Sequence, residues 1–355
     1  MTQDPQISII IPIYKVEKFL EECLDSVKRQ SFTAFEAILI DDKSPDNSLA
    51  IAKNFAAEDS RFILFEQPEN KGYGAAMNLG ISKVRSPYMT FLESDDFLAE
   101  NALEILYNAM QKEKVDLVWS SYFYCNFISK FKHFVVTNWA KIPSTGVSNS
   151  DQKPDIFLAR TEPWGILYNV NFWKTHDLHF LENKIENRWL MYQDLWLAFA
   201  TRLCAQKILV LATPLYYYRI HQDNSVAEKG KHQNSIFFPF LFEEINKLIK
   251  EKKNPQINSV KHKIFYDILV SNFIFFSEPI KEKLRKICSQ DLPLENPYLT
   301  VAQNQRYIHF IQGKSSDLRS PLEQIIRSNF FRPAFFWIKW FFYRLPLSIR
   351  KILKK

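Results

Sequence analysis

Residues 7–122 alternate between short runs of buried-type apolar residues and longer segments with helical spacing. Runs rich in β-branched residues predict strands, and apolar residues three and four positions apart predict one face of a helix. Strands are expected at 7–14, 35–42, 61–67, 88–94 and 115–122, and helices at 16–30, from about 46 to 58 and from about 73 to 83. Repeated strand and helix units form mostly parallel sheets with helices on both faces. The pattern therefore predicts an α/β fold with a Rossmann-like central sheet.

The pattern is less regular after Tyr122. A helix is expected around residues 186–206, a strand at 214–220, and mostly helical structure over 231–291. On this basis we divide the chain into two halves of one α/β domain, residues 1–122 and 123–228, a helical C-terminal extension, 229–320, and a tail, 321–355.

Composition adds limits to this picture. The chain has 355 residues, is 46% hydrophobic and contains four cysteines, none of them in a C-x-x-C pair. This cysteine usage predicts neither a zinc knuckle nor a disulfide framework and favours a reducing cytoplasm. The N-terminus lacks the pattern of an export signal, and no run of about 20 uncharged apolar residues occurs. We therefore expect a cytoplasmic protein without a membrane-spanning helix.

The net charge of +7 is concentrated at the C-terminus, because residues 324–355 contain eight basic residues and no acidic one. Aromatic bulk combined with regularly placed cations is typical of an element that lies in the headgroup region of an anionic membrane. The alternative is a helix that closes the core, with its cations solvated. The first interpretation predicts peripheral association with the inner face of the cytoplasmic membrane. Nucleic acid is not expected as a partner, since no RNA- or DNA-binding module accompanies the charge.

Polar side chains follow each of the first four expected strands. They are Tyr14, Asp41, Asp42, Asn70, Lys71, Glu93, Asp95 and Asp96. Ligands of such sheets sit beyond the carboxyl ends of the strands, so these groups are expected to meet at one edge. Taken singly, an acidic turn of this kind is more often an exposed loop than a site. A dinucleotide site is disfavoured, because the glycine-containing stretch "GYGAAMNLG" lacks the third glycine and follows the third strand.

A carboxylate cluster at this position suits a hard divalent cation bound to substrate phosphates. Mg²⁺ or Mn²⁺ would neutralise the charge that develops on a departing diphosphate. In the stretch "ESDD", Glu93 and Asp95 alternate and can act on one ligand, whereas Asp96 points elsewhere.

These residues carry a resemblance. The order "IIIPIYKVEKFLEECLDSVKRQS", "AILIDDKSPDNS", "NKGYGAAMNLGI" and "YMTFLESDDF" resembles the nucleotide-sugar-binding half of glycosyltransferase family 2, which has the GT-A fold. The later stretches "EPWGILYNVNFWKTHDLHF", "MYQDLWLAFAT" and "PLYYYRIHQDNS" resemble the acceptor half of bacterial members that build lipopolysaccharide, capsule or related surface glycans. The resemblance reaches about residue 226.

The resemblance implies roles for individual residues. Those matching nucleotide-sugar contacts are Pro12, Tyr14, Glu17, Asp41, Asp42, Ser44, Asn70, Gly72, Asn78, Glu93 and Ser94. Among them, Asp41 matches the acid that recognises uracil. Asp95 is the implied metal ligand of the D-x-D motif, and Asp194 falls on the general base. His221 is interpreted either as a contact to the donor diphosphate or as an ordinary loop histidine.

The chain departs from the family pattern in three places. Glu93 stands where aspartate is frequent, which lengthens the side chain by one methylene; Gln193 replaces a glutamate that commonly precedes the base; and Lys43 replaces a frequent glycine. The pair Arg188–Trp189 lacks the upstream glutamine of processive synthases, so Trp189 is interpreted as a packing residue.

Asp194 also has a physical case of its own. In an SN2-like displacement, a carboxylate removes the proton from the attacking hydroxyl, which accelerates the reaction roughly 10²–10⁴-fold. The position of Asp194 near the start of a helix favours its ionised form. The alternative is a helix cap.

The sequence thus predicts an inverting, metal-dependent hexosyl- or N-acetylhexosaminyltransferase. Its donor would be a UDP-sugar, its cofactor Mn²⁺ or Mg²⁺, and its acceptor a lipid-linked or surface-polysaccharide glycan. Two alternatives remain open: a catalytically silent sugar-nucleotide or glycan-binding subunit, and a nucleotidyltransferase.

Overall fold

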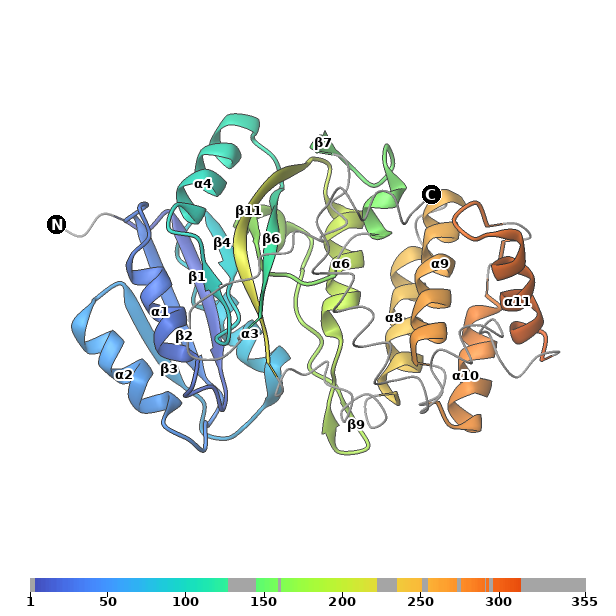
Figure 1. Cartoon of the computed structure of the whole chain (residues 1–355), viewed down its shortest axis with the longest axis horizontal. Coiled ribbons are helices and arrows are strands. Elements are labelled where there is room, and N and C mark those ends of the chain that lie inside the picture. The colour runs from blue at the N-terminus through green and yellow to red at the C-terminus, as the bar shows by residue number, and fades with distance from the viewer. Residues whose placement is uncertain are drawn as a thin grey trace, which may run out of the picture.

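The computed structural model describes residues 4–126, 145–158, 161–221, 235–250, 255–272, 276–290, 292–293 and 296–313. Within these ranges the centre of the molecule is a nine-stranded sheet (Figure 1). Its strands, in spatial order, are β3 (Phe62–Glu66), β2 (Phe35–Asp41), β1 (Ile7–Ile13), β4 (Tyr88–Phe91), β8 (Ile166–Asn169), β6 (Leu117–Asn126), β11 (Ile208–Ile220) and β5 (Phe97–Leu98), with β7 (Gly146–Ser148) paired to β11.

The sheet is mostly parallel. β1 pairs in parallel with β2 and β4, β2 with β3, and β6 with β11, whereas β8, β5 and β7 run antiparallel to their neighbours. The predicted α/β fold class is therefore confirmed. Because the first four expected strands point the same way, their carboxyl ends lie at one edge, where the candidate site is found.

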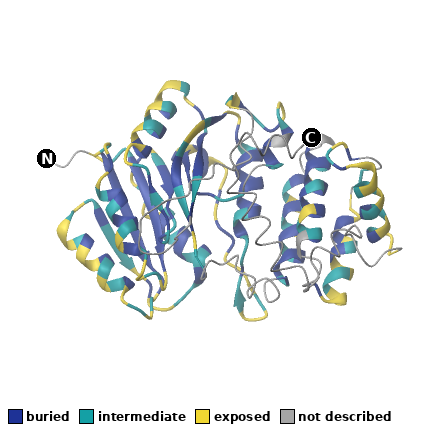
Figure 2. Cartoon of the chain, in the orientation of Figure 1, coloured by how far each residue is buried: buried dark blue, intermediate teal, exposed yellow. Residues whose placement is uncertain are grey.

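Helices cover both faces of the sheet. One face carries α1 (Leu20–Lys28), α2 (Ser48–Glu58) and α4 (Ala102–Glu113), and the other carries α3 (Gly72–Ser82), α5 (Val170–Thr175) and α6 (Gln193–Cys204). β1 shows why both faces are covered. Ile9 and Ile11 pack in the apolar cluster that includes α1, α2 and α4, whereas Ile10, between them, packs in the cluster that includes α3, α5 and α6. The strands are accordingly buried and the exposed residues lie on the outer helices (Figure 2).

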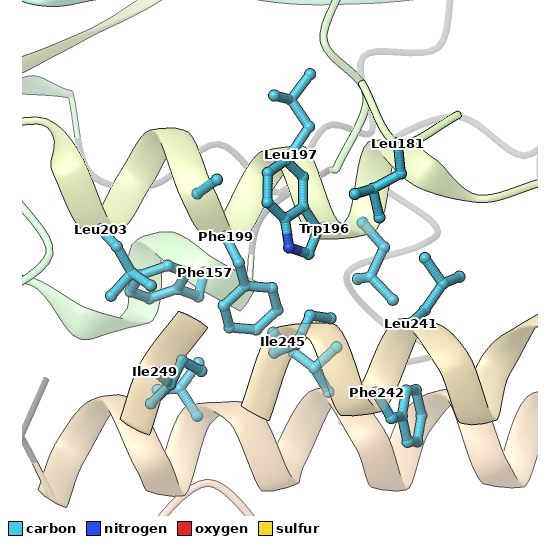
Figure 3. Packing of buried hydrophobic residues seen from close by; sticks show 14 of the residues in the cluster. Phe157, Leu181, Trp196, Leu197, Phe199, Leu203, Leu241, Phe242, Ile245 and Ile249 are labelled. Carbon is cyan, nitrogen blue, oxygen red and sulfur yellow. The ribbon is translucent and has the colours of Figure 1, made fainter. Parts of the chain in front are cut away.

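Four further helices follow β11. They are α8 (Phe237–Lys250), α9 (Pro255–Asn272), α10 (Glu278–Cys288) and α11 (Val301–Ile311). Their apolar side chains continue the cluster that contains α6, and Figure 3 shows Phe199 and Leu203 of α6 facing Ile245 and Ile249 of α8. The Phe199 ring also stacks on Phe157 of the 3-10 helix Pro154–Leu158, with ring centroids 5.0 Å apart. The predicted helical extension is thus present and is joined to the sheet through α6.

The helix expected around 186–206 is wrong in its first part. Residues 184–189 form a hairpin of β9 (Lys184–Ile185) and β10 (Arg188–Trp189), and α6 begins only at Gln193. The backbone φ angles are +50° at Glu186, +60° at Asn187 and +62° at Tyr192. Two successive positive φ angles form the tight turn of a two-residue hairpin and cannot continue a right-handed helix.

In the described part of the chain, no helix is both long and apolar enough to cross a membrane. The predicted membrane-binding tail, residues 321–355, lies outside the described residues.

Candidate active site

The loop between β4 and β5 carries the three carboxylates of the ESDD stretch. Asp95 meets a histidine from the far end of the sheet: its Oδ2 lies 2.9 Å from Nε2 of His221, which directly follows β11. The His221 ring lies against Phe19, with centroids 4.4 Å apart. The side chains of Asp95 and His221 are 25% and 14% exposed, so both remain accessible. A carboxylate and an imidazole, far apart in sequence, are thereby brought together.

Asp96 holds this loop in place. It is fully buried and accepts hydrogen bonds from the backbone N–H of Arg219 at 2.7 Å and from the hydroxyl of Tyr216 at 2.7 Å. The Arg219 guanidinium donates in turn to the backbone oxygen of Asp95 at 2.8 Å and pairs with Glu22 at 2.9 Å. As expected, Asp96 points away from Asp95 and towards backbone. It positions the loop and is not available to a ligand.

Glu93 is held by helix α3, whereas Asp95 and Asp96 contact residues at the end of β11. The Tyr73 hydroxyl donates to its Oε1 at 2.6 Å. Burial, together with the negative charges of Asp95 and Asp194, raises the pKa of Glu93 to about 8, and the Tyr73 hydrogen bond opposes this shift. A cation at Asp95 would lower this pKa, because an opposite charge favours the ionised carboxylate. The longer glutamate side chain is what reaches α3.

Asp194 lies in the first turn of α6. Tyr192, not Asp194, occupies the N-cap position, so the helix-cap interpretation does not describe this residue. The Thr161 hydroxyl donates to Asp194 Oδ2 at 3.1 Å. Burial and, after it, the neighbouring Glu162 carboxylate raise the pKa of Asp194 to about 6, against the opposing effect of hydrogen bonds from Thr161 and the helix amides. A carboxylate with this pKa is ionised at neutral pH and still basic enough to accept a proton.

Asp194 and the D-x-D loop face the same site. The charge of Asp194 raises the pKa of both Glu93 and Tyr73, after the larger effect of burial on each. Asp194 is thus close to Tyr73 and Glu93, and Glu93 is in turn close to Asp95, which contacts His221. An arrangement with Asp95 and Asp194 on opposite sides of the molecule would have excluded a common site.

The loops after β1 and β2 form a second part of this edge. Asp41, only 1% exposed, accepts the backbone N–H of Ser44 through both oxygens at 3.3 Å. Tyr14 is 47% exposed and Pro12 is buried within β1. Glu17 accepts the backbone N–H of Asn47, at the start of α2, at 2.9 Å. These contacts fix both loops and leave the Tyr14 ring as their exposed aromatic surface.

Asp42 organises the beginning of α3. Its two oxygens accept the backbone N–H groups of Lys71 at 2.7 Å and Gly72 at 2.9 Å, and Gln67 donates to it at 2.8 Å. Asn70 donates to the backbone oxygen of Asp42 at 3.3 Å. A side chain with all these donors, 3% exposed, orients the loop and is not free to bind a nucleotide directly.

Two other predicted residues also serve the framework. Asn78 donates to the Phe180 carbonyl at 2.8 Å and accepts the Phe180 N–H at 2.8 Å, which joins α3 to the segment before the hairpin. Ser94 is 6% exposed. Of the predicted contacts, the structure therefore brings Asp95, His221, Glu93 and Asp194 together and engages Asp42 and Asn78 elsewhere.

The residues present fit a divalent cation that shares its ligands with a substrate. Among the described residues, no three His, Cys, Asp or Glu side chains are grouped closely enough to hold a metal alone. Asp95 and His221, whose Oδ2 and Nε2 atoms lie 2.9 Å apart, would supply one oxygen and one nitrogen ligand. Mg²⁺ in particular is usually held by one or two carboxylates together with substrate phosphates and water. Two protein ligands are therefore sufficient when a substrate diphosphate and water supply the remaining ligands.

Sequence reasoning missed Tyr73, Thr161, Glu162, Tyr216 and Arg219. The last two could have been suspected, because "YYYRIH" places an arginine and a histidine at the end of an otherwise apolar strand. Thr161 and Glu162 gave no signal, since only the fold brings their segment to the start of α6.

Comparisons with known proteins agree with this geometry. Residues 8–167 match the family model of glycosyl transferase family 2. This match covers less than half of the chain, which is therefore similar to glycosyltransferase family 2 over its N-terminal part. EpsH of Bacillus subtilis is 29% identical over 243 residues, which are 66% of this chain and 66% of EpsH. The poly(ribitol-phosphate) beta-glucosyltransferase of Bacillus spizizenii is 28% identical over 240 residues, 66% of this chain and 34% of that protein.

Solved structures support the same fold. Residues 1–349 of S. aureus TarS, crystallised with UDP-GlcNAc, superpose with a TM-score of 0.66 at 18% identity, over 88% of this chain and 89% of that one. The GT-A fold expected for family 2 is therefore confirmed. The chain spans 66% of EpsH and 34% of the poly(ribitol-phosphate) beta-glucosyltransferase.

Proposed function

We propose that the protein is an inverting, divalent-metal-dependent glycosyltransferase that moves one hexosyl or N-acetylhexosaminyl group from a UDP-sugar to a surface-glycan acceptor. The observation that carries the proposal is the Asp95–His221 contact, with Asp194 close enough to Glu93 and Tyr73 for its charge to raise their pKa values.

The donor is inferred from the likeness of the nucleotide-binding edge to family 2. The TarS domain with the same fold was crystallised with UDP-GlcNAc, which supports a UDP-sugar. The uracil would lie by Asp41 and the exposed ring of Tyr14, next to the loops after β1 and β2. The diphosphate would then extend towards Asp95 and His221.

The reaction follows from this placement. Asp194 accepts the proton of the acceptor hydroxyl while its oxygen attacks the anomeric carbon, and UDP leaves from the opposite face. A bound divalent cation would stabilise the negative charge on the leaving diphosphate. Asp95 and His221 would hold that cation, and Arg219 and Asp96 keep their loop in position. Attack from the face opposite to the leaving group inverts the anomeric configuration.

The acceptor class is inferred from the relatives. One of them is named as a poly(ribitol-phosphate) beta-glucosyltransferase, which supports a polyol or glycan of the cell surface as acceptor. The acceptor that we propose is a lipid-linked or surface-polysaccharide glycan.

Release of UDP from a panel of UDP-sugars tests the proposal. We expect slow Mn²⁺-dependent release by the wild-type chain, no release by Asp95→Ala, and a loss of roughly 10²–10⁴-fold with Asp194→Asn, because a general base contributes that factor. His221→Ala should raise the Mn²⁺ concentration needed for half-maximal rate. Full activity of Asp194→Asn, or activity in EDTA, would contradict the mechanism.

A catalytically silent binding subunit is the second candidate. The observation that favours it is the hydrogen bond from Tyr73 to Glu93, which engages one oxygen of the first acid of the motif. Such a protein would bind UDP-sugars in calorimetry without releasing UDP from any of them. Turnover in the panel eliminates it.

We further propose that residues 321–355 bind an anionic membrane surface and keep the enzyme near its acceptor. The support is the excess of cations among aromatic residues in this segment. Vesicles with and without phosphatidylserine should pellet the full chain only in the anionic case, with binding weakened by salt. A chain ending at residue 320 should stay in the supernatant. Equal pelleting of both chains would refute the membrane role.

A further inference from the structure

A cavity of about 660 Å³ lies in the helical extension, where the β9–β10 hairpin meets α8 and α10 (Figure 1). Small-molecule sites usually have volumes of roughly 300–1,000 Å³. Part of its wall is apolar and comes from all three elements, through side chains that include Ile185, Phe240, Ile280 and Ile287. The proposed catalytic and metal-binding residues are not among those that line it, so the transfer reaction leaves its role open.

Two lysines of α10, Lys283 and Lys286, also line the cavity. Both are exposed, and neither forms an ion pair with another residue of the described ranges, whereas the two other cations of α10 pair with acids of the same helix. Residues three positions apart on a helix lie side by side. The two ammonium groups can therefore approach one anion together.

Two acidic residues line the cavity as well. Glu186, in the hairpin turn, pairs with Arg188 at 3.5 Å, which offsets its charge. Glu243 of α8 is exposed and opposes the binding of an anion. Three cations thus stand against two acids, and the α10 side of the cavity carries the positive charge.

We propose that this cavity binds the lipid phosphate of a lipid-linked acceptor, with hydrocarbon against the apolar wall and phosphate oxygens at Lys283 and Lys286. A lipid monophosphate, or the diphosphate that joins a lipid to a glycan, carries about two negative charges near neutral pH, against about one for a phospholipid diester. Two adjacent ammonium groups suit the doubly charged group. This inference rests on the acceptor class of the proposed function.

The β9–β10 hairpin lies between the cavity and the candidate active site. Ile185 of β9 lines the cavity, and the paired strand β10 carries Trp189, whose ring fills the space against Gly72 at the start of α3. The residue after Gly72 is Tyr73, which donates to Glu93. A glycan attached to a lipid in the cavity would therefore have the width of this hairpin to span.

Site-resolved acetylation of the full chain tests the proposal. The probe is dodecyl phosphate below its micelle concentration, and mass spectrometry reads each lysine separately, so that any binding to the C-terminal tail is seen apart. At roughly ten times its Kd, the probe should slow acetylation of Lys283 and Lys286 about 10-fold. Lys112 of α4, with a side chain 82% exposed, should react at an unchanged rate. Protection of the tail alone, or none, overturns the proposal.

Three other probes separate the possible sources of this chemistry. Dodecyl maltoside has the chain without the charge, inorganic phosphate has the charge without the chain, and dihexanoyl phosphatidylglycerol is a phospholipid diester. We expect each to protect the two lysines at least about 10-fold less well, because chain and charge both contribute. Equal protection by any of the three would assign the cavity to an uncharged amphiphile, a soluble anion or bulk membrane lipid, and would overturn the proposal.

Calorimetry with substituted chains gives a second readout. Lys283→Ala combined with Lys286→Ala should weaken the binding of dodecyl phosphate at least about 10-fold, because a hydrogen bond to a charged group corresponds to roughly a 10–100-fold effect. Glu243→Gln should strengthen it by removing a repulsion, and Lys112→Ala should leave it unchanged. Unaltered affinity of the double lysine variant, or weaker binding by Glu243→Gln, would contradict the proposed site.

The two proposals fail separately. UDP release by wild type without protection of Lys283 and Lys286 refutes only the lipid site. Protection by dodecyl phosphate in a chain that releases UDP from no donor refutes only the transfer reaction.

Discussion

At the scale of single residues, surroundings give identical carboxyl groups different tasks. Asp96 and Asp42 are saturated with donors and hold loops, while Asp95 and Asp194 each receive one side-chain partner and stay open to a ligand. The sequence located these residues by motif. It could not tell which were engaged, because the donors come from other segments, 25–30 residues away for Asp42 and more than a hundred residues away for Asp96.

The raised pKa of Asp194 implies a conflict between stability and function. Its folded-state pKa of about 6 exceeds the ordinary value of 3.8, so the unfolded chain loses this proton first as pH rises. The free energy of unfolding therefore falls as pH rises through that interval, and the penalty is fully present above about pH 6. Asp194→Asn should be at least as stable as wild type at about pH 8 and gain less at about pH 4, by urea unfolding. Asp267→Asn, at an exposed position of α9, serves as the control.

The same shift predicts the pH dependence of activity. Asp194 must be ionised to act as base, so UDP release should rise as pH increases through about 6. A rate that is flat from about pH 5 to pH 8 would contradict the assignment of Asp194.

Lys43, which replaces a glycine frequent in the family, lies at a position with a left-handed backbone conformation. Its φ is +62°, in the left-handed region that glycine adopts without cost. The frequent family glycine at this position therefore answers a conformational need of the turn after β2. A lysine can meet the same need at a cost of roughly 1 kcal/mol.

At the scale of elements, α3 is the helix on which the site is built. Its start receives Asp42, its Tyr73 holds Glu93, and its glycines permit close approach of the segment that leads to α6. A Cβ added at Gly74 would lie 2.5 Å from the Leu181 carbonyl oxygen and 2.6 Å from Gln193 Oε1. The G-x-G stretch, which resembled a dinucleotide motif, thus has a packing role.

Gly74→Ala distinguishes packing from helix propensity. Propensity alone would make the alanine more stable by about 1 kcal/mol. The clash with backbone should dominate and lower the free energy of unfolding by roughly 1–3 kcal/mol. Ala57→Gly, at an exposed position of α2, measures propensity alone and should cost about 1 kcal/mol. An increase in stability for Gly74→Ala would show that the α3 contact is loose.

Element boundaries were predicted least well in the segment before α6. The sequence "ENRWLMYQ" offers helix-forming residues and helical apolar spacing, yet it forms a hairpin and a left-handed residue. Trp189 explains why, because its ring fills the space against Gly72 and fixes the hairpin on α3. The interpretation of Trp189 as a packing residue agrees with this contact, which only tertiary structure could reveal.

At the scale of the whole molecule, the helical extension supports the helix that carries Asp194. Ile245 and Ile249 of α8 face α6 (Figure 3), and the Phe242 and Phe265 rings of α8 and α9 stack 3.7 Å apart. α6 is therefore held between the sheet and the extension. The position of Asp194 depends on both.

Ile245→Ala tests this dependence. Truncating a fully buried isoleucine should lower the free energy of unfolding by roughly 2–5 kcal/mol, measured in urea. Val301→Ala, at a side chain 77% exposed on α11, should change it by less than about 0.5 kcal/mol. Equal effects of the two substitutions would mean that the extension does not stabilise the domain.

The sequence by itself determined the α/β architecture, the positions of the first four strands along the chain, and the carboxylates that follow them. These features depend on local hydrophobic periodicity and on the rule that parallel strands end at one edge. Tertiary structure alone decided which carboxylates are saturated, that His221 meets Asp95, and that Glu162 lies beside Asp194. The physical reason is that hydrogen-bond donors and neighbouring charges come from segments distant in sequence, and burial, which sets both the pKa and the cost of an unpaired oxygen, is a property of the folded chain.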